Sequence, residues 1–121
     1  MQSVTTYSQV VARTVGCLRQ QQGTLDQKSF AEFLGVSAST WSRIENGQVG
    51  LALDQLAHAA TLLGFASASE LLAVADRAAD NMRRQGVRVL TGREAAKDDQ
   101  TFAYLGAAAL GALLAAALVK R

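Results

Sequence analysis

The first 86 residues are divided by glycines into five short stretches with apolar residues at helical spacing. Hydroxyl or carboxylate side chains stand where a helix N-cap is expected, at Thr6, Asp26, Ser37 and Ser67. Glycines close the stretches, as is typical of helix C-termini, at Gly23, Gly35, Gly47, Gly64 and Gly86. The chain contains no proline, and we therefore expect an all-α fold of five helices over residues 1–86. The alternating segment Val87–Leu90 is too short to anchor a sheet.

The second and third helices are predicted to form a helix-turn-helix. The second runs from about Gln27 to Leu34, and Gly35-Val36-Ser37 leads into the third. Trp41 and Ile44 lie three residues apart and should face inward. The outer face is then small or polar, which favours entry into the major groove of DNA; it consists of Ala38, Ser39, Ser42, Arg43 and Asn46. In the fourth helix, Leu53, Leu56, Ala60 and Leu63 mark an apolar stripe.

Two side chains of this unit suit particular DNA contacts. Arg43 is the one long donor on the outer face, and a guanidinium can bind a guanine edge in bidentate fashion. Gln27 begins the second helix, where its side chain and backbone N–H can bind a phosphate oxygen.

Residues 25–47, LDQKSFAEFLGVSASTWSRIENG, resemble the Cro/cI-type (XRE) family of DNA-binding domains. The resemblance continues to Leu63-Gly64 and covers roughly residues 7–75. It implies a five-helix, lambda-repressor-like domain that acts as a dimer on two-fold operator DNA, and an ion pair between Arg19 and Glu45. It also implies DNA contacts by Gln27, Lys28, Ser37, Ala38, Ser39, Thr40, Ser42, Arg43, Asn46 and Gln48.

Two features predict that DNA binding has modest sequence specificity and that the affinity for DNA depends only weakly on salt concentration. Ala38 stands where the family often has a long polar reader, and alanine contacts only a thymine methyl group. Residues 1–86 also carry seven basic and seven acidic side chains, so that any attraction to phosphate comes from a local patch. The single Cys17 and single His58 exclude most metal sites. We expect no catalytic residues, no metal and no cofactor.

The remainder of the chain has a different character. Residues 87–100 mix charges of both signs and are interpreted as a linker. Residues 101–121 are predicted to form a separate C-terminal apolar helix, in which Phe102–Val119 carries no charge over 18 residues. Such a helix is about 27 Å long, close to the ~30 Å of a bilayer core, and a transmembrane anchor is the favoured interpretation. Ala107, Gly111 and Ala115 form a small-residue seam that suits helix pairing.

The sequence therefore predicts a DNA-binding transcriptional regulator, dimeric and held on the cytoplasmic side of a bacterial inner membrane. A soluble regulator or antitoxin in the cytoplasm or nucleoid, with a C-terminal helix that drives oligomerisation, remains open. So does a membrane-tethered helix-turn-helix scaffold that binds a protein partner in place of DNA.

Overall fold

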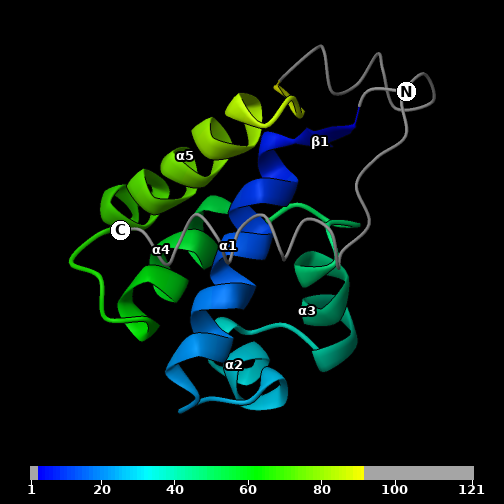
Figure 1. Cartoon of the computed structure of the whole chain (residues 1–121). Helices are drawn as coiled ribbons and strands as arrows, with labels where there is room; N and C mark the ends of the chain where they lie inside the picture. Colours follow the sequence, from blue (N-terminus) through cyan, green and yellow to red (C-terminus); the bar gives the residue numbers. More distant parts are fainter. Residues whose placement is uncertain (1–2, 92–121) are drawn as a thin grey trace.

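The computed structural model describes residues 3–91, which form five helices framed by two short strands. Helix α1 runs through the centre, with α4 and α5 on one side and α2 and α3 on the other (Figure 1). The elements in chain order are β1 (Val4–Thr6), α1 (Tyr7–Gln22), α2 (Gln27–Leu34), α3 (Ala38–Glu45), α4 (Leu53–Leu62), α5 (Ala68–Arg84) and β2 (Arg88–Leu90).

The helices begin and end where the sequence predicts. Thr6 accepts a hydrogen bond from the Gln9 backbone N–H at 3.1 Å, and Gln9 Oε1 accepts one from the Thr6 N–H at 3.0 Å, which completes a capping box. The side chains of Asp26 and Ser37 cap α2 and α3 by accepting one hydrogen bond each, from the Ser29 N–H at 2.7 Å and from the Thr40 N–H at 3.1 Å. The five closing glycines all have positive φ angles. The predicted five helices are thus confirmed.

The core is built around two aromatic rings. Trp41 and Phe30 are fully buried, and their ring centroids lie 5.0 Å apart at an angle of 43°. Ile44 is buried beside them, as expected from its spacing from Trp41. The stripe predicted for α4 is wrong at one position, since Leu53 is 81 % exposed. It is the first residue of α4, and its side chain lies away from the core that Leu56 enters.

The fold is mostly helical, as expected for an all-α chain, but β1 and β2 add a two-stranded parallel sheet that the sequence did not predict. The register places Val4 opposite Arg88 and Thr6 opposite Leu90. Val4 and Leu90 are buried, so each strand also packs against a helix, β1 against α1 and β2 against α5. Three residues per strand are too few for a recognisable sequence pattern. The folded part therefore includes Arg88–Leu90, which the sequence prediction assigned to the linker.

Tyr7 ties the start of α1 to α5. Its hydroxyl donates a hydrogen bond to Asp76 Oδ1 at 2.5 Å. Burial, followed by this hydrogen bond and the charge of Asp76, raises the pKa of Tyr7 from 10.0 to about 12. Tyr7 loses its hydroxyl proton at a higher pH in the folded state than in the unfolded state. The free energy of unfolding should therefore fall as the pH rises from about 10 towards 12.

The raised pKa of Tyr7 is measurable from the absorbance of the ionised tyrosine side chain near 295 nm. In a Tyr104→Phe variant, Tyr7 is the sole tyrosine, and we expect one titration step near pH 12. In a further Asp76→Ala variant the step should move towards pH 10. A midpoint near 10 before Asp76 is replaced would contradict the Tyr7–Asp76 contact.

None of the helices within residues 3–91 is both long and apolar enough to cross a bilayer. The predicted apolar helix at 101–121, its seam at Ala107, Gly111 and Ala115, and residues 92–100 of the linker lie outside the described residues.

Candidate nucleic-acid interface

The turn between α2 and α3 is sharp and fixed by backbone hydrogen bonds. Gly35 has a φ of 77°, and its N–H donates to the carbonyl of Glu32 at 3.1 Å. The Val36 N–H donates to Ala31 O at 3.0 Å. A side chain at Gly35 would be strained in this conformation. The turn therefore sets the angle at which α3 leaves α2.

Helix α3 divides into a buried face and an exposed face. Trp41, Ile44 and Glu45 are buried. Ser39 and Arg43 are exposed, and so is Ala38 at the start of the helix, whereas Thr40 and Ser42 are half-buried. Apart from Arg43, the exposed side chains on this helix are short, so the backbone can approach the floor of a major groove.

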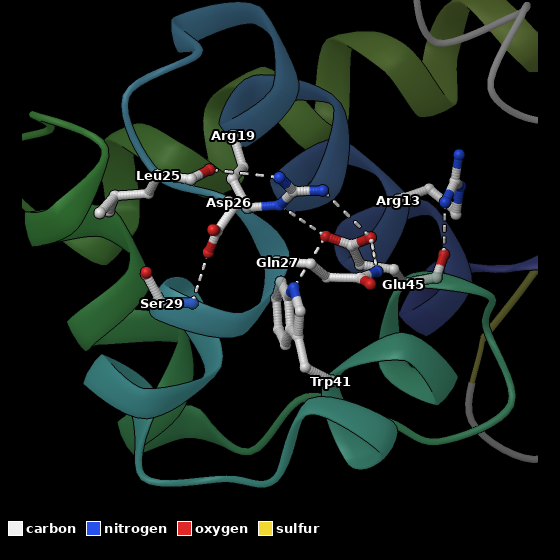
Figure 2. A network of polar contacts seen from close by, with 8 residues as sticks. All are labelled: Arg13, Arg19, Leu25, Asp26, Gln27, Ser29, Trp41 and Glu45. Atoms are coloured by element: carbon white, nitrogen blue, oxygen red, sulfur yellow. Dashed lines mark hydrogen bonds and ion pairs between the residues drawn. The ribbon is translucent and has the colours of Figure 1, made fainter.

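A single buried carboxylate holds α3 against two other helices. Glu45 is 3 % exposed, and its oxygens accept hydrogen bonds from side chains on three helices (Figure 2). The donors are Arg19 Nε at 2.9 Å, Arg19 Nη2 at 3.5 Å, Gln27 Nε2 at 2.8 Å and Trp41 Nε1 at 2.7 Å. The ion pair between Arg19 and Glu45 is thus one part of a network that joins α1, α2 and α3.

Gln27 has a place in this network that the sequence did not indicate. Its amide donates inward to Glu45 Oε2, whereas the resemblance assigned it to a phosphate. An amide NH₂ group has two N–H donors. A phosphate contact therefore has to use the second N–H of Gln27 or its backbone N–H, and the inward bond fixes the direction in which that amide points.

A second set of contacts, which the sequence did not indicate, holds the C-terminal end of α3. Arg13 Nη1 donates to the Glu45 carbonyl at 2.8 Å, and Gln9 Nε2 donates to the Gly47 carbonyl at 3.3 Å. Gly16 lies on the same face of α1, where an added Cβ would stand 3.2 Å from Glu45 Cγ. A glycine within an otherwise regular helix was the one available signal of this close approach.

Gly47 completes the end of α3 and begins the loop that follows. Its φ is 79°, and an added Cβ would lie 2.8 Å from Gln9 Cγ. Within the described residues, the loop carries the exposed Asn46 and Gln48. The Gln48 N–H donates to Arg43 O at 2.9 Å. The loop thus starts from a fixed point at the end of α3.

Comparison with known proteins agrees with this geometry. A family model described as a helix-turn-helix domain matches residues 10–74, which is more than half of the 121-residue chain. The chain belongs to the helix-turn-helix family. This membership agrees with the Cro/cI-type resemblance of residues 25–47. No curated protein and no solved structure gives a significant match.

The DNA-facing residues proposed for this helix-turn-helix domain lie along one continuous stretch of chain. They occupy the start of α2, the turn, α3 and the loop after it. Lys28 is exposed, and so is Ser37, whose hydroxyl is already engaged with Thr40 N and with Thr40 Oγ1 at 2.9 Å. A phosphate bound at Ser37 would share that hydroxyl with the helix cap.

The local charge of this helix-turn-helix domain is small. The hydrogen bond from the Ser29 backbone N–H lowers the pKa of Asp26, which therefore stays ionised beside Lys28. Arg43 is the other exposed cation on this surface. Asp26 and the exposed Glu32, which follows Lys28 by four positions on α2, offset these two cations. Such a balance supports few phosphate contacts, in line with the even charge of residues 1–86.

Proposed function

We propose that the protein is a sequence-specific DNA-binding transcriptional regulator that acts as a homodimer and inserts α3 into the major groove. The observation that carries this proposal is the division of α3. Its inner face is locked by Trp41, Ile44 and Glu45, and its outer face offers Ser39 and Arg43 free of the core. A rigid helix with short exposed side chains is a suitable base reader.

The proposed contacts divide into readers and anchors. Arg43 binds a guanine edge, while Ala38 and Ser39 contact thymine methyl groups or base edges. Gln27, Lys28, Thr40, Ser42, Asn46 and Gln48 contact the sugar-phosphate backbone. With one strong base-reading side chain, part of the specificity comes from the shape and deformability of the DNA.

Selection of bound sequences from a random duplex library tests this function. The full chain should enrich an inverted repeat with a guanine at the same place in each half-site, because a two-fold dimer presents α3 twice. The affinity for the enriched site should fall only moderately between 50 and 200 mM salt, since few phosphates are neutralised. A selection with no enriched motif would contradict the proposal.

We further propose that residues 102–119 tether this regulator to the cytoplasmic face of a bacterial inner membrane. The support is the uncharged 18-residue sequence and the basic residues before it, Arg84, Arg88, Arg93 and Lys97. Ala107, Gly111 and Ala115 would then let two anchors pair closely.

Alkaline carbonate extraction of cell membranes tests the tether. The full chain should stay in the membrane pellet, and a chain in which Leu110 and Leu113 are both replaced by lysine should be released. Each lysine costs about 2.5–3.5 kcal/mol near the centre of a membrane helix. Replacement of Leu53 and Phe33 by lysine is the matched control and should not cause release. Release of the unchanged chain would contradict the tether.

A scaffold that binds protein in place of DNA is the second candidate. The observation that favours it is the inward hydrogen bond of Gln27, which removes one N–H from any phosphate contact. The library selection separates the two candidates, because a scaffold of this kind enriches no duplex sequence.

A further inference from the structure

An apolar groove lies between the start of α1, the start of α4, α5 and the end of β2. Its volume is about 380 Å³. Among the described residues, its lining contains no charged side chain and consists mainly of leucines, namely Leu51, Leu53, Leu56, Leu72 and Leu90. A groove of this size and composition favours an uncharged, apolar occupant.

The rim of the groove leaves apolar surface open to solvent. Leu53 is 81 % exposed, more than the other large apolar side chains that stand exposed within residues 3–91, Phe33 at 55 % and Val49 at 37 %. Leu51 and Leu72 are only half-buried. Exposed apolar surface that is gathered in one place, rather than scattered singly, marks a site of interaction.

The described part of the chain ends at the wall of this groove. Thr91, the last described residue, is one of the lining residues. Ten residues follow, 92–101, of which five are charged, and Phe102 then begins the uncharged sequence that continues to Val119. The nearest part of the sequence that matches the uncharged lining of the groove is therefore the apolar segment 102–119 of the same chain.

The ten intervening residues keep this apolar segment close to the groove. A flexible chain of ten residues has an end-to-end distance of about 16–19 Å, and a helix of ten residues is about 15 Å long. Either length places Phe102 within about 20 Å of Thr91. A segment on so short a tether has an effective concentration in roughly the millimolar range. A second copy of the chain matches this only when the protein itself is that concentrated, so the tether favours the segment of the same chain.

We propose that this groove binds the apolar segment of its own chain, beginning at Phe102, whenever that segment is not in a bilayer. The apolar side chains nearest to the tether, Phe102 and Leu105, enter the groove, and the charged residues of 92–101 stay in water. The contact removes Leu53 and part of the apolar segment from water together. Exchange of the segment between groove and bilayer is the part of this inference that rests on the proposed tether.

Cross-linking within the full chain tests the contact. The chain carries Cys17→Ala, which removes the single native thiol, together with Ser8→Cys in the wall of the groove and Ala103→Cys beside Phe102. Ser8 is exposed, so its replacement should leave the fold intact. Isotopically labelled and unlabelled chains are made by cell-free synthesis without membranes, mixed, and treated with a short bismaleimide. Mass spectrometry of the digest should find the two cysteines joined within single chains.

Ser3→Cys in place of Ser8→Cys is the matched control. Ser3 is also an exposed serine, and its carbonyl accepts a hydrogen bond from the Arg88 N–H of β2, but it does not line the groove. The yield with Ser8→Cys should exceed the yield with Ser3→Cys several-fold. Leu53→Asp, which puts a carboxylate on the exposed rim, should reduce the Ser8→Cys yield to that of the control. Equal yields for the two serine positions, a yield that Leu53→Asp leaves unchanged, or links mainly between labelled and unlabelled chains would overturn the proposal.

Vesicles of phosphatidylethanolamine and phosphatidylglycerol, present during synthesis, test the exchange between groove and bilayer. They should lower the yield of the product within single chains several-fold, because the segment then enters the bilayer. An unchanged yield from a chain that resists carbonate extraction would overturn the exchange. The cross-link formed without membranes and without DNA is measured independently of both the carbonate extraction and the library selection, so a failure of the proposed function is distinguishable from a failure of this contact.

Discussion

Replacement of Glu45 by alanine is expected to lower the free energy of unfolding by about 3–5 kcal/mol. The change leaves the Arg19 guanidinium buried without its counter-charge, and it removes the acceptor of the Trp41 indole and the Gln27 amide. Chemical denaturation followed by circular dichroism measures the loss. The same variant should bind DNA weakly, since α3 is no longer fixed to α1 and α2.

Glu32→Ala is the matched control, because Glu32 is an exposed carboxylate on α2. It should change the free energy of unfolding by less than about 0.5 kcal/mol. The double variant Arg19→Met/Glu45→Leu removes both charges together and should recover part of the loss. A loss below 1 kcal/mol for Glu45→Ala would contradict the role assigned to the network.

Replacement of Arg43 by alanine should weaken binding to the selected DNA site by roughly 1–3 kcal/mol, about 5- to 150-fold, while stability stays unchanged. Arg43 is exposed and lies outside the Glu45 network, so the effect comes from the lost base contact. Fluorescence anisotropy with labelled duplexes measures the affinity. Preference at the guanine position of each half-site should relax in the same variant.

Lys28→Ala is the control for a phosphate contact. It should weaken binding to selected and unrelated DNA sequences alike. It should also reduce the slope of log affinity against log salt concentration by about one. If Arg43→Ala behaved in this same uniform manner, Arg43 would be a phosphate anchor and the assignment of the base reader would be wrong.

The local signals of the sequence predicted the helical part of the fold well. Caps such as Thr6 and Asp26, and closing glycines such as Gly35, act within a few residues of chain. Their positions therefore gave the helix bounds without knowledge of the tertiary structure. The burial of Trp41 and Ile44 followed from their spacing on α3 for the same reason.

The features that the sequence did not indicate depend on contacts between distant segments. The pairing of Val4–Thr6 with Arg88–Leu90 joins the two ends of the domain through strands too short to form a pattern. The contact from Arg13 to the Glu45 carbonyl depends on how α1 crosses α3. The exposure of Leu53 depends on the position of α4 relative to the core. None of these follows from residues near in the sequence.

The exposed residues of the candidate interface were predictable from the sequence, whereas the hydrogen bonds that hold α3 in place were not. The exposure of Ala38, Ser39 and Arg43 agrees with the face predicted from helical spacing. The inward bond of Gln27 was not predictable, because a glutamine at the start of a helix can bind a phosphate or a neighbouring side chain with the same amide. In the folded chain the amide of Gln27 donates to Glu45, which lies 18 positions away in the sequence.

Methylation interference on the selected duplex tests the central claim, which is that the exposed face of α3 reads base edges in the major groove. Methylation of guanine N7 blocks contacts in that groove. The unchanged chain should lose binding when one guanine in each half-site is methylated, and the Arg43→Ala variant should become insensitive to methylation at those same guanines. Binding by the unchanged chain that is indifferent to N7 methylation throughout the site, or sensitivity that persists in the variant, would contradict the claim.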